Sequence, residues 1–322
     1  MFYICGFKLF KKLKRYFTAT IFLAILACFL WSTAFVGIKL GLKFTTPLNF
    51  AGIRFFLSGL MIIPFTGGIG KYFREVKLHY RHILNVSLFQ TFLLYSLFYT
   101  GISMASASVS AIIVGAGPLF VALMANFIID NDKLTGKKLL SIFIGFSGII
   151  LIAVDRFEIN WEKGREFWGI LILVIANIAG SFGNILVSKN KSAVSPLVLN
   201  SAQIMFGGLG IFVLSLFLED HNFGIKPLEY YLSLTYLSLL SAIAFSIWFV
   251  LLKRPGVKVS ELNIWKFLIP VFGALLSWLI LPDEYPESIQ VTGMMCIAFS
   301  LVLLNKPNLV SLRIFFRRTL HK

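Results

Sequence analysis

Ten apolar runs fill most of this chain of 322 residues, and each is long enough to cross a lipid bilayer as a helix. A helix rises about 1.5 Å per residue, so about 20 apolar residues span the hydrocarbon core. The runs cover residues 18–42, 47–66, 82–102, 106–129, 136–154, 167–188, 195–218, 230–252, 259–281 and 286–304. Because backbone polar groups in lipid must be paired within each segment, these runs predict an all-α, polytopic membrane protein with ten transmembrane helices.

The composition excludes a soluble globular protein. Hydrophobic residues make up 58% of the chain and charged residues only 14%, whereas charged residues make up about 25% of ordinary soluble domains. The three cysteines, Cys5, Cys28 and Cys296, are scattered and form no pattern typical of a metal site or a disulfide framework. No phosphate-binding loop occurs, and we expect no metal and no cofactor.

The basic residues mark one side of the predicted bundle. With ten spans both termini lie on the same side, and 22 of the 30 lysines and arginines fall in the tails and loops of that side. Positive charge collects on the cytoplasmic face of membrane proteins, so the tails 1–17 and 305–322 are predicted to be cytoplasmic, in the plasma or inner membrane. The net charge of +16 then reflects topology and attraction to anionic lipid headgroups, and not nucleic-acid binding.

Matched landmarks divide the chain into two repeats. Four positions recur at matching spacings in both halves, namely Pro47 with Pro196, Arg54 with Gln203, Pro118 with Pro270, and Asp132 with Glu284. Residues 18–154 and 167–304 each hold five of the runs. Because five is odd, the second repeat must enter the membrane upside down, and such inverted repeats are common in secondary transporters with a midplane site.

Three stretches carry a resemblance to a known family. The segment LWSTAFVGIKLGLKFTTPLNFAGIRFFLSGL, Leu30–Leu60, resembles the opening of the EamA repeat in the drug/metabolite transporter superfamily, and Ala105–Ile152 and Trp248–Leu304 resemble later parts of the two repeats. The chain departs from the family pattern at Asn131-Asp132, where Gly-Glu is usual. The resemblance implies ten helices in two inverted five-helix repeats around a central cavity. It also implies export or exchange of amino acids, related metabolites or drugs.

Charged side chains inside the runs point to function, because an ion in the hydrocarbon core is costly. Three occur, Lys39, Arg54 and Lys266, and no acidic residue falls inside a run. Lys39 lies near the end of its run, where its ammonium can snorkel to water. Arg54 can bind an anionic substrate group bidentately or pair with the carboxyl end of a helix. Lys266 is the favoured substrate-facing cation, with snorkelling as its alternative.

Polar and aromatic residues near mid-run complete the predicted substrate-binding set. They are Trp31, Ser32, Tyr95, Tyr99, Asn177, Asn184, Trp248 and Trp265. Asn177 and Asn184 are seven residues apart, so they share one helix face. Trp and Tyr offer an apolar wall with one polar handle. The alternative for each residue is a hydrogen bond between helices or a place in an interfacial belt.

Pro118 and Pro270 fall in mid-run at matching positions of the two repeats. Each proline lacks a backbone donor and frees the carbonyl four residues earlier, at Val114 and at Lys266. Such a carbonyl is tolerated in a membrane only where protein, water or ligand satisfies it. We expect both prolines to kink their helices at the cavity and to act as hinges, the alternative being a passive kink buried in the bundle.

These features favour a secondary transporter that exports amino acids or related small metabolites or drugs by alternating access. A channel, a receptor or a membrane scaffold without active transport is the alternative. An enzyme is disfavoured, because there is no HExxH motif and no pair of acidic residues within the runs. The expected partners are a small-molecule substrate and the lipid bilayer, and a homodimer is left open.

Overall fold

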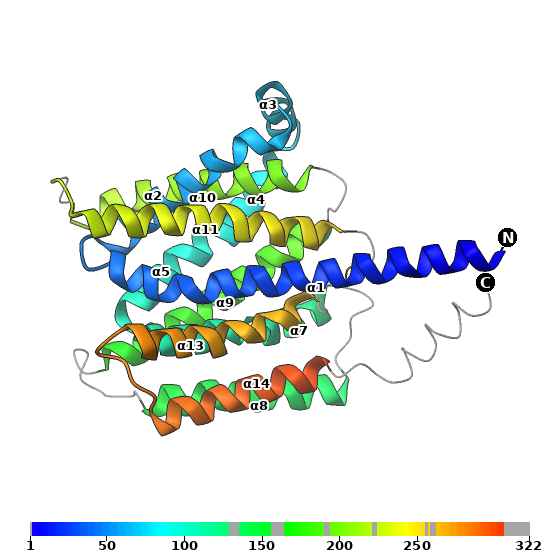
Figure 1. The fold of residues 1–322 in the computed structure, drawn as a ribbon. Helices are drawn as coiled ribbons and strands as arrows, with labels where there is room; N and C mark the ends of the chain where they lie inside the picture. The colour runs from blue at the N-terminus through cyan, green and yellow to red at the C-terminus, as the bar shows by residue number, and fades with distance from the viewer. Residues whose placement is uncertain are drawn as a thin grey trace.

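The computed structural model describes residues 2–128, 135–155, 164–189, 194–220, 224–254, 257 and 262–305. In this part of the chain all regular structure is helical (Figure 1). The helices are α1 (Phe2–Gly41), α2 (Pro47–Ile62), η1 (Ile63–Thr66), α3 (Ile69–Leu78), α4 (Tyr80–Ser87), η2 (Leu88–Leu93), α5 (Leu94–Met104), α6 (Ala107–Gly115), α7 (Gly117–Ile128), α8 (Gly136–Asp155), α9 (Arg165–Lys189), α10 (Pro196–Leu218), α11 (Leu228–Lys253), η3 (Ile264–Phe267), α13 (Leu268–Ile280) and α14 (Ser288–Asn305).

Eight helical segments are long and apolar enough to cross a membrane. They cover Thr20–Gly41, Pro47–Thr66, Tyr80–Met104, Ala107–Ile128, Gly136–Asp155, Arg165–Val187, Pro196–Leu218 and Leu228–Lys253. Two shorter apolar helices follow, Leu268–Ile280 and Ser288–Leu303. In the predicted ninth run, the α-helix α13 begins only at Leu268, because the 3-10 helix η3 occupies Ile264–Phe267.

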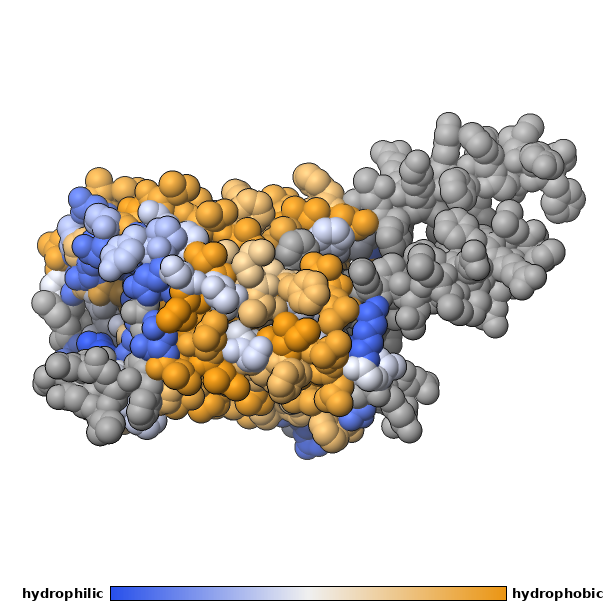
Figure 2. Space-filling view, turned by 90° about the horizontal axis from the view of Figure 1, so that it is seen from below, coloured by the Kyte–Doolittle hydropathy of each residue, from blue (hydrophilic) through white to orange (hydrophobic). Residues whose placement is uncertain are grey.

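The surface separates apolar from polar residues along the bundle. Figure 2 shows hydrophobic side chains over the middle of one face, with hydrophilic side chains gathered toward its two ends. Large apolar side chains such as Phe217 and Leu279, each 80% exposed, lie on the outside of their helices. Water would solvate these side chains poorly, whereas lipid solvates them well, so the outer surface fits a bilayer.

Corresponding helices of the two halves pack in antiparallel pairs. The clearest pair is α2 with α10, whose backbones come into contact where glycine leaves room. A Cβ atom on Gly52 would meet the backbone nitrogen of Phe212 at 2.5 Å, and one on Gly208 would meet that of Phe56 at 2.5 Å. Residue numbers rise along α2 while they fall along the facing stretch of α10, so the two helices run in opposite directions.

The other helix contacts are also symmetric between the two halves. α8 lies against α14 and α6 against α13, while α1 lies against α11 in the way that α9 lies against α5. If each helix is replaced by its counterpart in the other half, every pair becomes either the same pair or another of these pairs. The fold therefore carries the internal repeat that the landmark residues predicted.

Two helical paths are interrupted near the centre of the bundle. α6 ends at Gly115 and α7 begins at Gly117, just before Pro118. In the second half η3 precedes α13, which contains Pro270. The two interruptions are in contact, because a Cβ atom on Gly115 would lie 2.3 Å from Cδ of Pro270. Glycine at this position lets the two broken paths approach each other.

Carboxylates join the two halves at both ends of the bundle. At one end Glu219, which follows α10, accepts hydrogen bonds from the backbone N–H groups of Leu48 (2.7 Å) and Asn49 (2.9 Å) at the start of α2. At the other end Glu75 of α3 accepts one from the backbone N–H of Ser195 (2.9 Å), immediately before α10. Each half thus supplies a carboxylate to the amino end of the corresponding helix in the other half, where the helix dipole favours negative charge.

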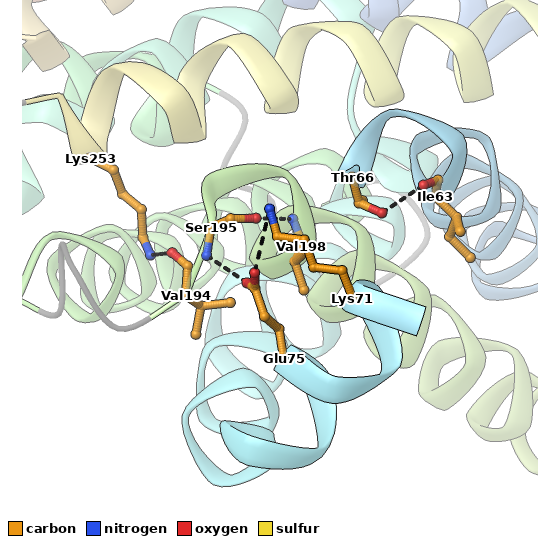
Figure 3. A network of polar contacts seen from close by, with 8 residues as sticks. All are labelled: Ile63, Thr66, Lys71, Glu75, Val194, Ser195, Val198 and Lys253. Atoms are coloured by element: carbon orange, nitrogen blue, oxygen red, sulfur yellow. Dashed lines mark hydrogen bonds and ion pairs between the residues drawn. The ribbon is translucent and has the colours of Figure 1, made fainter. Parts of the chain in front are cut away.

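Helix α3 occupies a stretch that the sequence treated as a loop between two runs. Its Tyr72 side chain is 1% exposed, which anchors the helix to the bundle. Figure 3 shows Glu75 between Lys71, whose ammonium lies 3.8 Å away, and the backbone of Ser195, with the Lys253 ammonium donating to the carbonyl of Val194 nearby. The end of α11, the start of α10 and α3 are therefore tied together.

The amino end of α6 receives two carboxylates. Glu284 accepts from the backbone N–H groups of Ala107 (2.6 Å) and Ser108 (2.8 Å). Glu166, near the start of α9, accepts from both the backbone N–H and the hydroxyl of Ser106, each at 2.9 Å. These acidic residues, which the sequence placed in loops, therefore cap a helix of the opposite half.

Candidate functional site

A cavity of about 110 Å³ lies between the two halves. Side chains from α1, α2, η2, α5, α6 and α7 form one part of its wall, and side chains from α9, α11, η3 and α13 form the other. Seven of the ten predicted substrate-binding residues line it, namely Trp31, Arg54, Tyr95, Asn177, Asn184, Trp248 and Lys266. None of the described residues that line the cavity is acidic.

Arg54 reaches the cavity wall but is held by other side chains. It is 2% exposed, and its guanidinium donates to the hydroxyls of Tyr99 and Ser241 (2.8 Å to Ser241) and to the carbonyl of Leu237 (3.2 Å). The guanidinium carbon also lies 4.8 Å from the ring centroid of Phe55. Each of its three nitrogens is committed to the protein, so Arg54 cross-links α2 to α5 and α11.

Lys266 lies in a different environment. Its ammonium is 4.9 Å from the ring centroid of Trp248 and 5.8 Å from that of Trp31. It forms no hydrogen bond or ion pair with the described residues. Contacts with aromatic rings stabilise a desolvated cation by about 2 kcal/mol, whereas removing an ammonium from water costs several kcal/mol. The rings therefore offset only part of the cost, and water or an anion must supply the rest.

The two asparagines hold the wall in place. Asn177 donates to the carbonyl of Ile113 (2.8 Å), one turn before the interruption between α6 and α7. Asn184 donates to the carbonyl of Gly180 (3.1 Å) and accepts from the indole nitrogen of Trp248 (3.3 Å). The second contact fixes the orientation of the Trp248 ring beneath the Lys266 ammonium.

Sequence reasoning missed Gln90 and Ser181, which also line the cavity. Gln90 is 4% exposed, and its Oε1 atom has no hydrogen-bond partner among the described residues. The buried Nε1 atom of Trp31 likewise has no hydrogen-bond partner among the described residues. A mid-run amide and a serine one turn after Asn177 were the available signals, since residues four apart share a helix face.

Three predicted residues lie outside the cavity lining. Ser32 is fully buried and donates to the carbonyl of Cys28 (2.8 Å). Tyr99 accepts from Arg54, and Trp265 packs against the hydrophobic core. Ser32 follows a lining residue, and adjacent residues on a helix point about 100° apart. The polarity and depth of these residues therefore did not predict which way their side chains point around the helix axis.

The two prolines lie beside the interruptions of their helical paths, and both are buried. Neither proline ring lines the cavity. Their neighbours Val114, Gly117 and Ile269 do. The proline rings pack within the bundle, and their role as hinges stays a prediction.

Comparison with known proteins agrees with this architecture. The model of the EamA-like transporter family matches residues 18–154 and 167–306. The chain belongs to the EamA-like transporter family. Members of this family are transporters and not enzymes, so the chain is a multi-pass membrane protein with a small-molecule substrate.

Several EamA-like relatives cover nearly the full chain. An uncharacterised transporter of Synechocystis is 25% identical over 86% of this chain and 87% of its own length. A "probable amino-acid metabolite efflux pump" of Escherichia coli is 28% identical over 87% of this chain and 93% of its own. An S-adenosylmethionine/S-adenosylhomocysteine transporter of Chlamydia muridarum is 23% identical over 84% and 86%.

A solved crystal structure shares the fold. It superposes with a TM-score of 0.66, covers 89% of this chain and 97% of its own, and is 16% identical. At this identity the likeness concerns the fold alone.

Proposed function

We propose that this protein is a secondary transporter that exports amino acids or related small metabolites or drugs by alternating access. The observation that carries the proposal is a cavity whose wall comes from both antiparallel halves. A site shared by two oppositely oriented units can open to either side when one unit rocks against the other. The printed names of the Escherichia coli and Chlamydia muridarum relatives support the substrate range.

We propose further that the chain crosses the membrane ten times, in two inverted five-helix repeats at 18–154 and 167–304. Two observations support the ninth and tenth crossings. The segment from Ile264 to Ile280 and the helix α14 each extend about 25 Å or more at helical rises, close to the thickness of the hydrocarbon core. In addition, α14 packs along α8, which is itself long enough to cross.

In this topology both tails lie in the cytoplasm of a cell whose plasma or inner membrane holds the protein. The excess of basic residues on that side supports this orientation. Membrane-impermeant labelling of cysteines placed at each terminus would test it. Labelling of the two termini from opposite sides would exclude ten crossings.

The predicted substrate-binding residues are proposed to act at this cavity. Trp31, Tyr95, Asn177, Asn184, Trp248 and Lys266 form the proposed contact surface, with Arg54, Ser32, Tyr99 and Trp265 supporting it. The touching interruptions beside Pro118 and Pro270 are the proposed hinges, because a broken helix bends more easily than a continuous one. No cofactor and no nucleic acid takes part in this scheme, and a homodimer is compatible with it.

Counterflow in proteoliposomes tests the function directly. Purified full-length protein should exchange labelled amino acids against unlabelled amino acids with saturable kinetics. Saturation and exchange distinguish a carrier from the alternative of a channel, whose flux does not saturate in this range. Absence of saturable flux for a broad panel of amino acids, nucleosides and cationic dyes would overturn the proposal.

A further inference from the structure

The cavity contains a charge that the described protein leaves without a counterion. The Lys266 ammonium lies against two indole rings, whereas each nitrogen of Arg54 donates to a protein group. Lys39, the remaining lysine within the spans, does not line the cavity and interacts with the carboxylates of Glu284 and Glu166. Lys266 is thus set apart by its surroundings and not by its residue type.

The two indole rings that contact this ammonium supply no anionic acceptor. The Nε1 atom of Trp31 is buried and has no partner within the described structure, and the ring that carries it is one of the two that contact the Lys266 ammonium. The equivalent atom of Trp248 is already bonded to Asn184. An ammonium with no acidic residue in the described lining forms a site for an anion.

Lys266 is the cation whose donors are open to a ligand. Arg54 adds positive charge to the same wall, but each of its nitrogens already donates to Tyr99, Ser241 or Leu237. A carboxylate, the anionic group that amino-acid substrates carry, matches one open ammonium.

Building on the transport function proposed above, we propose that Lys266 binds the carboxylate of the transported molecule. Substrates are then small carboxylates, amino acids included. The remainder of the substrate lies along the aromatic wall of Phe35, Phe98 and Phe245. Molecules without the carboxylate lose the contact that compensates Lys266 and bind weakly.

The proposal predicts an unusual relation between stability and binding. In the empty protein the half-buried Lys266 ammonium has no counterion among the described residues, so replacing it with an apolar side chain of similar length removes an unfavourable contribution to stability. Lys266→Met should therefore melt at the same temperature as the native protein or higher, while it loses binding of carboxylates. A lysine retained for packing alone would show the opposite pattern.

The experiment compares matched pairs of compounds on four proteins. The proteins are the native chain, Lys266→Met, Lys266→Arg and the control Lys39→Met. The compounds are the common amino acids and simple monocarboxylates, each paired with its carboxamide. Binding is measured as the thermal shift of the purified full-length protein in detergent, and transport as counterflow in proteoliposomes.

We expect at least one carboxylate to stabilise the native protein, with its carboxamide about tenfold weaker or more, as loss of a charge-assisted contact implies. Lys266→Met should lose this preference, Lys266→Arg should keep part of it, and Lys39→Met should behave like the native protein. The site assignment fails if carboxamides bind as well as carboxylates, or if Lys266→Met keeps the preference. Should Lys266→Met not fold, the comparison of acid with amide on the native protein and on Lys266→Arg still decides.

The outcome separates this inference from the transport function. Saturable flux of neutral or cationic compounds, together with no binding of any carboxylate, would overturn the carboxylate site and leave the transporter in place. Absence of saturable flux of every compound would overturn transport itself. Binding of carboxylates without flux would support the site and contradict transport.

Discussion

Arg54 and Lys266 place two positive charges at one cavity, but the contacts around each charge give the two residues different roles. Arg54 lies where α2, α5 and α11 meet, and protein groups occupy each of its nitrogens. Lys266 lies beside an interruption of its helical path and faces two aromatic rings. The first charge holds helices together, whereas the second is left for a ligand.

The difference follows from what surrounds each charge and from the half of the chain that supplies it. The position matching Arg54 in the second half is Gln203, which accepts a hydrogen bond from the Thr91 hydroxyl (2.6 Å). The position matching Lys266 in the first half is Val114, which also lines the cavity. Each charged residue thus occupies a position where the other repeat has a neutral residue. The inverted repeat therefore determines the arrangement of the helices, whereas the positions at which the two repeats differ determine the charges at the cavity.

The largest effect is expected at Arg54. Arg54→Met leaves the Tyr99 and Ser241 hydroxyls and the Leu237 carbonyl without their donor, and buried unsatisfied groups cost about 1–3 kcal/mol each. The free energy of unfolding should fall by about 3 kcal/mol or more. Unfolding in denaturing detergent and the yield of monodisperse protein measure this fall.

Arg54→Lys is the matched control, because it keeps the charge but lacks the planar guanidinium whose separate nitrogens reach Tyr99, Ser241 and Leu237. It should lie between the native protein and Arg54→Met. If Arg54→Met folded as well as the native protein and lost only carboxylate binding, the contrast between the two cations would collapse, and Arg54 would be a ligand of the substrate.

The next effect concerns the interruption beside Lys266. Gly115→Ala places a methyl group 2.3 Å from Cδ of Pro270, and such overpacking costs about 1–3 kcal/mol. We expect slower counterflow with binding largely kept, because the two broken paths can no longer rest against each other. Gly136→Ala, where nothing lies within 4 Å, is the control and should change neither quantity. Equal rates for the two variants would show that this contact does not move during transport.

Smaller and opposite effects are expected at the two ends. Glu219→Gln and Glu75→Gln weaken the carboxylate contacts with the starts of α2 and α10, each worth about 1 kcal/mol. That energy shifts an equilibrium between two access states about fivefold. The labelling rate of Ala34→Cys, in a background without other cysteines, measures the shift from each side of the membrane. The two variants should shift the access equilibrium in opposite directions. A shift in the same direction would contradict the idea that each carboxylate joins the two halves at one end and so keeps that end of the cavity closed.

Hydropathy and spacing were enough to predict the helical fold and its repeat. Pro47 and Pro196 begin α2 and α10 as their matched positions implied, because a proline at the first turn is set by local geometry. The helix α3 was missed because its amphipathic sequence is too polar for a membrane run and was taken for a loop.

The site was only partly predictable, because depth in a helix can be read from the sequence while rotation cannot. Trp31 lines the cavity and its neighbour Ser32 does not. Lys266 and Trp265 differ in the same way. The carboxylate caps were not recognised, since Glu219 and Glu75 depend on contacts between segments far apart in the chain.

The smallest effect tests the wall that holds Lys266. Trp248→Phe keeps an aromatic ring near the ammonium but removes the donor to Asn184, a single neutral hydrogen bond worth about 1 kcal/mol. We expect a slight loss of carboxylate affinity, about fivefold or less, with the preference for acid over amide retained. Trp248→Leu also removes the ring and should weaken the preference further, because the cation then loses one of its two aromatic contacts. Equal affinities in the two variants would mean that the ring only shapes the cavity, and that the carboxylate compensates Lys266 without help from Trp248.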